Sequence, residues 1–319
     1  MPPEVLAPPR VAHDSAHRAD DSCSEAPPRR ASGAASSPVS EAVSEAVHRS
    51  AFARDIHTER VSDDRFVGAV DDRWRVLRGP NGGFLAAILL EAMIRRGGDD
   101  SRSPRVLTAH YPRVPRPGPI EVRTRELRHG RSISWLEADL VQQGEVCVVA
   151  RAAFSDTWPS LEYARWSAPT LLPPDRGAPL GDELPPFTRH FDYRSLLATP
   201  ADRAGHDAVG GYIRLRDPHP YDAPLITAMT DAWFPSTFAR DPQPVMAATL
   251  DLTVHFRSYA ALRRLDPRDY VVSLFRSRLA TEGFFEEDGE IFAPNGDLIA
   301  HSRQLAIATP YAPRGAIGA

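Results

Sequence analysis

The chain contains no lysine, and all 38 of its basic residues are arginine. A Schiff-base enzyme needs a lysine amine, and a Walker-type loop needs a lysine beside the phosphates, so both kinds of site are excluded. Cysteine is also scarce, since only Cys23 and Cys147 are present. Two cysteines cannot form a disulfide framework, and Cys147 lies in an apolar segment where a small buried side chain is expected rather than a nucleophile. This cysteine usage predicts a cytoplasmic location.

Other signals are missing as well. The sequence has no clustered His or Cys spacing such as HExxH or CxxC, so no metal site is expected. No apolar run is long enough for a signal peptide or a membrane span. The formal net charge of −4 is close to balance for 319 residues, which indicates neither a nucleic-acid partner nor an anionic membrane.

The first 50 residues differ in composition from the rest of the chain. They are rich in Pro, Ala, Ser, Glu and Arg and hold almost no aromatic residues. Such a segment cannot bury enough apolar surface to offset the entropy lost on ordering. We therefore expect residues 1–50 to form a disordered, dispensable tail and residues 313–319 to form a second, short tail.

The sequence does contain one pattern of strands and turns that occurs twice. Residues 120–154 read as strand, turn, strand, turn, strand, and residues 271–307 repeat this order. Each half also has an apolar, helix-like segment upstream of its strands. Aligning Gly144 with Gly296 brings the two patterns into register, which suggests a duplicated structural unit.

One position breaks this symmetry. In the alignment, the first half has the small apolar Ala152 where the second half has Gln304. A duplication in which only the second copy carries the polar groups suggests two structural copies that share one working site.

Periodicity predicts an α+β fold. Residues 84–94 are apolar nearly all round, which is typical of a buried helix. Residues 66–76 predict a first strand, and residues 106–154 predict three or four more with the period-two alternation of an antiparallel sheet with one wet face. We expect an N-terminal domain at residues 51–165, a Pro-rich linker at 166–186 and a C-terminal domain at 187–312, each with an antiparallel sheet that wraps a central hydrophobic helix.

The second half predicts its own set of elements. Pro224 introduces a short helix at residues 225–234. The expected strands are residues 188–193, 211–215, 249–256, 271–279, 289–292 and 298–308.

Asp231 is the first candidate for chemistry, because it lies inside the apolar segment 225–234. A carboxylate there is either exposed on the one polar face of the helix or buried with partners. The neighbouring Trp233 and Phe234 favour a cleft.

Two further candidates lie on strands. The strand that begins at Thr249 alternates cleanly, so Thr249, Asp251, Thr253 and His255 are expected to share one face. For the last three a solvated face is the simplest interpretation, whereas Thr249 is nearest to a helix in the next layer. Gln304 stands among alanines, which favours an inward face, and a core amide bonded to backbone is an equal alternative.

Gly82 and Gly83 precede the first apolar helix. Their backbone N–H groups are expected to be sterically open at the helix N-terminus, where they could stabilise an oxyanion. A tight turn into the helix is an equal alternative.

These segments resemble the double-hotdog acyl-CoA thioesterase family, the type II thioesterases. The resemblance spans residues 52–310 and is carried by the motifs Gly82-Gly83-Phe84, Asp231-Ala232-Trp233-Phe234, Ala248-Thr249-Leu250-Asp251 and Ala300-His301-Ser302-Arg303-Gln304.

The resemblance implies a double hotdog that hydrolyses an acyl-CoA without a cofactor. It further implies that Asp231, Thr249 and Gln304 hold the hydrolytic water. The implied chemistry is coherent, because a carboxylate can act as general base while a hydroxyl and an amide fix the water's position. No covalent nucleophile is then needed.

Two rival functions stay open at this point. A hotdog hydratase or dehydratase would need a His/Asp pair, and His255 and Asp251 share a predicted strand face, although no hydratase-type motif surrounds them. A non-catalytic acyl-binding double hotdog is the second rival. The sequence leaves open the acyl chain length, the choice between CoA and a carrier protein, and whether the chain forms a homo-oligomer.

Overall fold

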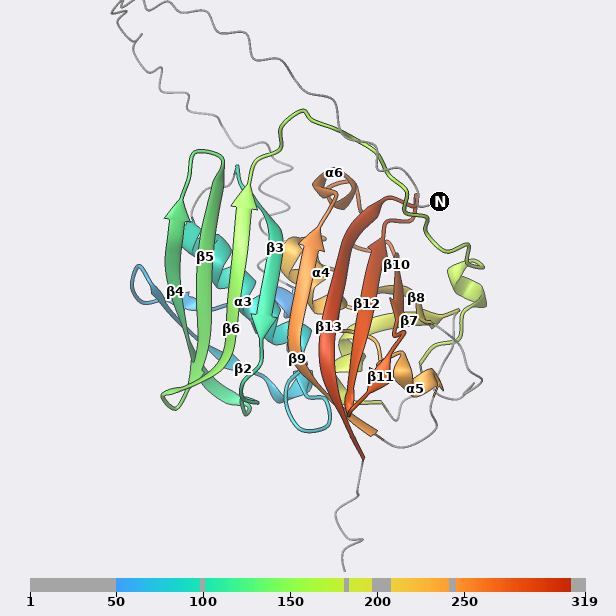
Figure 1. The fold of residues 1–319 in the computed structure, drawn as a ribbon, viewed down its shortest axis with the longest axis horizontal. Coiled ribbons are helices and arrows are strands. Elements are labelled where there is room, and N and C mark those ends of the chain that lie inside the picture. Colours follow the sequence, from blue (N-terminus) through green and yellow to red (C-terminus); the bar gives the residue numbers. More distant parts are fainter. Residues whose placement is uncertain (1–49, 98–100, 181–183, 197–207, 241–244, 311–319) are drawn as a thin grey trace, which may run out of the picture.

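The computed structural model describes residues 50–97, 101–180, 184–196, 208–240 and 245–310 (Figure 1). The predicted tails at residues 1–50 and 313–319 thus lie outside the described residues, apart from Ser50. Ser50 caps helix α2 (Ala51–Ile56), and its hydroxyl lies 2.8 Å from Nδ1 of His219, where it is buried.

A single antiparallel sheet runs through both halves of the chain. The halves meet edge to edge where β3 (Ser103–His110) pairs with β9 (Val245–Phe256), so the two expected sheets are continuous with each other. Outward from β3, the first half contributes β6 (Glu145–Ser155), β5 (Ile133–Gln142), β4 (Gly118–His129), β2 (Arg65–Val70) and β1 (Glu59–Arg60). Outward from β9, the second half contributes β13 (Leu298–Pro310), β12 (Phe284–Phe292), β10 (Val271–Arg276), β8 (Val209–Leu215) and β7 (Phe191–Ser195), and β11 (Ala280–Thr281) pairs with β12.

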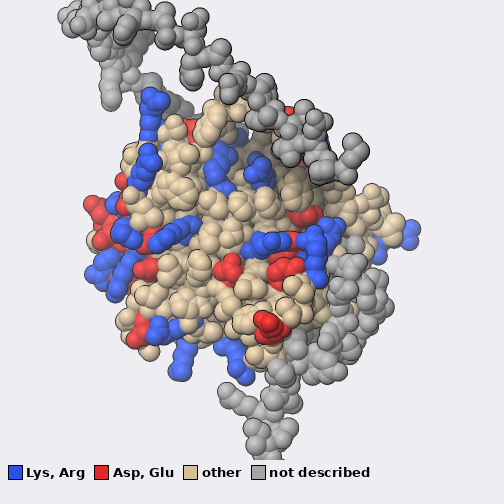
Figure 2. Space-filling model, viewed as in Figure 1, with Lys and Arg blue, Asp and Glu red and all other residues tan. Residues whose placement is uncertain are grey.

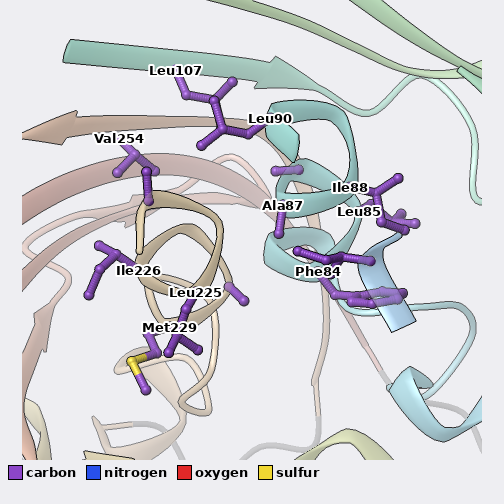
Figure 3. Close-up of a cluster of buried hydrophobic side chains, with 14 of the residues drawn as sticks. Phe84, Leu85, Ala87, Ile88, Leu90, Leu107, Leu225, Ile226, Met229 and Val254 are labelled. Carbon is purple, nitrogen blue, oxygen red and sulfur yellow. The ribbon is translucent and has the colours of Figure 1, made fainter. Parts of the chain in front are cut away.

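Two helices pack side by side against the inner face of this sheet. They are α3 (Gly82–Gly97) from the first half and α4 (Ala223–Met229) from the second. Figure 3 shows Leu225 and Ala87 on the facing sides of the two helices, within a cluster of buried apolar side chains. Burial on nearly every side explains why the α3 segment is apolar all round. The predicted α+β double hotdog is confirmed.

The shorter helical pieces lie at the margins of this two-layer arrangement. They are α5 (Thr237–Arg240), α6 (Tyr259–Leu262) and the 3₁₀ turns at Asp72–Trp74, Pro174–Arg176 and Pro186–His190. The segment that joins the two halves runs over one end of the sheet (Figure 1).

The predicted duplication is present in the hydrogen-bond register. Leu136 on β5 faces Ala152 on β6, and at the matching positions of the second copy Glu287 on β12 faces Gln304 on β13. The strand order is mirrored about the β3–β9 junction, so the two copies are related by an approximate twofold arrangement.

The outer face of the sheet repeats its polar pairs in both copies. Glu137 bonds to Arg151 in the first copy, and Asp288 bonds to Arg303 at the equivalent positions of the second. Figure 2 shows acidic and basic side chains interspersed on this face. The predicted alternation between a wet face and a buried face therefore holds in both copies.

Three predicted elements end earlier than expected. The strand expected at residues 271–279 ends at Arg276. The segment from residue 66 is a strand only to Val70, because Trp74 turns inward in a 3₁₀ turn and stacks between the rings of Phe84 and His190. The helix expected at 225–234 ends at Met229, where the Thr230 hydroxyl donates to the Thr227 carbonyl. Residues 186–190 form a 3₁₀ turn rather than the start of a strand.

The two halves depend on each other in this arrangement, because α3 packs on α4 and β3 completes the hydrogen-bond ladder of β9. We predict that residues 50–168 and 186–319, produced separately, aggregate or unfold, since each exposes an apolar face that the other half covers. Size-exclusion chromatography and thermal melting of each half, alone and mixed, measure this. A soluble, monomeric and fully active second half would contradict it.

Candidate active site

The N-terminus of α3 meets the turn that follows α4. Asn81 caps α3, since its Oδ1 accepts the Phe84 N–H at 2.9 Å. The same side chain reaches across the layer, where its Nδ2 donates to the backbone carbonyl of Asp231 at 2.7 Å and to the Asp231 carboxylate at 3.0 Å. One asparagine thereby joins the first copy to the residue predicted as the base.

Asp231 lies just beyond the C-terminus of α4, not inside a helix as the sequence predicted. Its Oδ2 accepts the Gly83 N–H at 2.9 Å, and the Gly82 N–H lies close enough to this carboxylate to lower its pKa. Burial raises the pKa of Asp231 to about 6, and the hydrogen bonds from Gly83, Gly82, Gln304 and Asn81 oppose that rise. The carboxyl is thus poised to change its protonation state near neutral pH.

Gly82 and Gly83 differ from the expectation of open N–H groups, because Asp231 accepts the Gly83 N–H and its carboxylate also lies beside the Gly82 N–H. A Cβ atom at Gly83 would lie 2.8 Å from the Asp231 Cβ, and 3.0 Å from the carbonyl oxygens of Ala228 and Thr227. Glycine at this position is therefore what allows α3 to approach the end of α4. The alternative of a tight entry into the helix describes this site better than a free oxyanion hole.

Thr249 does not share a face with Asp251, contrary to the prediction. The register between β13 and β9 shifts so that Leu305 faces Asp251 while Ala306 faces Thr249, which leaves Leu250 as the extra residue of a β-bulge. The bulge shifts the alternation, and the Thr249 hydroxyl donates to the Oε1 atom of Gln304 at 3.1 Å. Thr249 therefore belongs to the inner face.

Gln304 is buried, with 6% of its surface exposed, and it connects three polar groups. Its Oε1 accepts from Thr249, while its Nε2 donates to Oε1 of Glu287 at 3.1 Å, and the same amide lies close enough to the Asp231 carboxylate to lower its pKa. The amide is bonded to side chains rather than to backbone, so the alternative of a simple core amide does not apply. The structure brings Asp231, Thr249 and Gln304 together.

Glu287 and Tyr111 complete the cluster, and the sequence analysis missed both. Burial raises the pKa of Glu287 to about 7, although hydrogen bonds from Ser236 and Gln304 favour its ionised form. The Tyr111 hydroxyl donates to the Gly82 carbonyl at 2.9 Å. Period-two alternation could have found Glu287, because it is in phase with the buried residue Phe285 on β12. Nothing in the sequence near Tyr111 marks it.

The pair expected of a hydratase does not join this cluster. His255 and Asp251 lie on the outer face of β9, where His255 stacks on His301 at 4.7 Å between ring centroids. Trp166 from the connecting segment stacks on the other ring.

Within the described ranges, no group of three or more His, Cys, Asp or Glu side chains is placed to hold a metal ion. Among the helices that the structure describes, none has the length and apolar character needed to cross a membrane.

Comparison with known proteins adds an independent line of evidence. Residues 70–155 match the family model for the N-terminal domain of acyl-CoA thioesterases, and residues 167–308 match the model for the C-terminal domain. A search of curated proteins gave no significant match.

Several solved structures share the fold. A conserved protein of unknown function with a hot dog fold from Alicyclobacillus acidocaldarius is 22% identical with a TM-score of 0.74, covering 82% of this chain and 99% of its own. An acyl-CoA thioesterase II from Mycobacterium marinum is 22% identical with a TM-score of 0.66, covering 83% and 100%. A tesB protein from Mycobacterium avium subspecies paratuberculosis is 20% identical with a TM-score of 0.65, covering 84% and 99%.

The close approach at Gly83 can be tested by adding one methyl group. We predict that Gly83→Ala lowers stability by about 1–3 kcal/mol, because the new Cβ forces Asp231 and the end of α4 to shift. It should lower activity as well. Gly97→Ala is the matched control, since a Cβ there meets nothing within 4 Å in the last position of the same helix. Thermal melting and turnover of both variants are the measurements, and equal behaviour of the two variants would contradict the prediction.

Proposed function

Because this chain belongs to the acyl-CoA thioesterase family and is a thioester hydrolase, we propose that it hydrolyses a fatty acyl-CoA to the free acid and CoA with a water held by Asp231, Thr249 and Gln304. The observation that carries the proposal is that the Thr249 hydroxyl donates to the Gln304 amide oxygen, while the same amide lies close enough to the buried Asp231 carboxylate to lower its pKa. These three side chains come from β9, β13 and the turn after α4, and they converge on one point.

The donors and acceptors of this cluster decide how a water would sit. The Gln304 amide donates one hydrogen to Glu287, and the Thr249 hydroxyl donates its hydrogen to the Gln304 oxygen. The Thr249 oxygen and the Asp231 carboxylate therefore remain as acceptors for a water. A water that donates both its hydrogens to them turns its lone pairs outward, which is the orientation required for attack on a thioester carbon.

Asp231 is the proposed general base. As the water oxygen bonds to the thioester carbon, the water must lose a proton, and an ionised carboxylate within hydrogen-bond reach accepts it. Collapse of the tetrahedral intermediate then breaks the C–S bond, and the departing CoA thiolate takes up a proton to leave as the thiol. A pKa of about 6 suits this role, because the group is largely ionised at neutral pH yet basic enough to take the proton. The N–H groups of Gly82 and Gly83 hold this carboxylate at the positive end of the α3 dipole.

We predict that Asp231→Asn folds normally and loses roughly 10²–10⁴-fold in kcat, because the amide keeps the size and an acceptor oxygen but cannot take a proton. The assay is release of the free CoA thiol from a panel of acyl-CoAs of different chain length, with hydration of crotonyl-CoA followed in parallel. Asp251→Asn, on the outer face of β9, is the control and should keep native turnover.

The same residue sets the expected pH dependence. Since the base works only when ionised, the rate of the native chain should rise with pH up to about 6 and then level off. Residual activity in Asp231→Asn should lack this acidic limb. Near-native turnover of the Asn variant, or an unchanged acidic limb, would remove Asp231 from the mechanism, and hydration without thiol release would favour a hydratase.

Thr249→Val and Gln304→Ala test the water-holding role. Both should lower kcat more than they change KM, because these side chains act on the attacking water rather than on the acyl chain. Steady-state kinetics with one acyl-CoA of the panel measure both constants. A Gln304→Ala variant that raises only KM would assign Gln304 to substrate binding.

A further inference from the structure

A fourth polar side chain lies behind the proposed water site. Glu287 on β12 is only 4% exposed, and each of its carboxylate oxygens has its own partner. Oε1 accepts the Gln304 amide at 3.1 Å, and Oε2 accepts the backbone N–H of Ser236 at 2.6 Å. Ser236 belongs to the loop that begins at Asp231. The Glu287 carboxylate therefore hydrogen-bonds both Gln304 and the loop that carries Asp231.

The first copy shows that the fold has no need of polar groups here. The positions equivalent to Glu287 and Gln304 are Leu136 and Ala152, which face each other in the same register and are both buried. A buried carboxylate carries a desolvation cost that an apolar pair avoids. The adjacent outer-face pair, by contrast, is an acid with an arginine in both copies. At these neighbouring positions, therefore, the inner pair differs between the copies while the outer pair keeps its acid and its arginine.

We propose that Glu287 is a positioning residue, whose carboxylate holds the Gln304 amide and the Asp231 loop in the arrangement in which the water ligands converge. This inference rests on the proposed function. A carboxylate only accepts hydrogen bonds, so it compels Gln304 to present its NH₂ group to Glu287 and its oxygen to Thr249. A glutamine at position 287 could turn either its oxygen or its NH₂ group toward Gln304. It also has only one acceptor oxygen for the two donors, the Gln304 amide and the Ser236 N–H.

The test compares Glu287→Gln with Glu290→Gln in the full chain. Glu290 lies on the same strand with its side chain toward the outer face, near Arg276, so the same chemical change is made away from the site. Glu287→Gln should keep a native KM but lose about 10- to 100-fold in kcat, as expected for displaced ligands of a reacting water. Glu290→Gln should keep native kcat.

A double-mutant cycle separates positioning from a general structural role. In the Gln304→Ala background, Glu287→Gln should lower kcat by a clearly smaller factor than it does in the native chain, because the Gln304 amide, one of the two partners of Glu287, is gone. If Glu287→Gln melts below the native chain, Glu287→Asp serves in its place, since it keeps both acceptor oxygens on a side chain one methylene shorter. At a native melting temperature it should still show a reduced kcat.

The outcomes are distinguishable. Native kcat in Glu287→Gln together with a damaged Gln304→Ala would overturn this inference and leave the proposed function intact. The inference would also be overturned if the kcat losses of the two single variants multiplied in the double variant, because the two side chains would then act independently. Native kcat in Gln304→Ala would overturn the role of Gln304 itself, and the inference about Glu287 with it.

Discussion

The contact between the N-terminus of α3 and the Asp231 carboxylate is the interaction on which the site depends. It joins the two copies where α3 of the first copy reaches the turn after α4 of the second, with Gly83 and Asn81 as donors. Because the contact requires the absence of a side chain at Gly83, the geometry of the site is set by main chain rather than by mobile groups. The aligned N–H groups at the start of a helix also stabilise negative charge there. The proposed base is therefore held by the first copy, although Asp231 belongs to the second.

Duplication explains how one copy could acquire chemistry while the other keeps the fold. The β-bulge before Asp251 has a counterpart in the first copy, where the register of β3 shifts between Pro104 and Val106. The second copy places Thr249 at its bulge, and the first places Pro104, which has no hydroxyl to offer. The inner face of the first copy is apolar at the matching ladder positions. Its role is to support α3, and the polar side chains are left to the second copy.

The polar cluster is maintained against the preference of a core for apolar groups. Burial raises the pKa of both Asp231 and Glu287, which means that the surroundings disfavour their ionised forms. The Gln304 amide donates to Glu287 and lowers the pKa of both carboxyl groups, so it offsets part of the repulsion between them. Such a network costs stability where a Leu–Ala pair would not, and functional sites are where proteins tolerate that cost.

The sequence by itself determined the α+β class, the duplicated strand pattern and the buried α3 helix, because these depend on local periodicity, and its short motifs marked Asp231, Thr249 and Gln304 as candidates. Tertiary structure alone decided the rest. The bulge that turns Thr249 inward arises from pairing with β13, and the occupation of the Gly83 N–H arises from a contact between residues 148 positions apart. Glu287 becomes part of the site only because its strand lies beside Gln304. Strand register and helix docking are long-range properties, and no local pattern encodes which side chains they bring together.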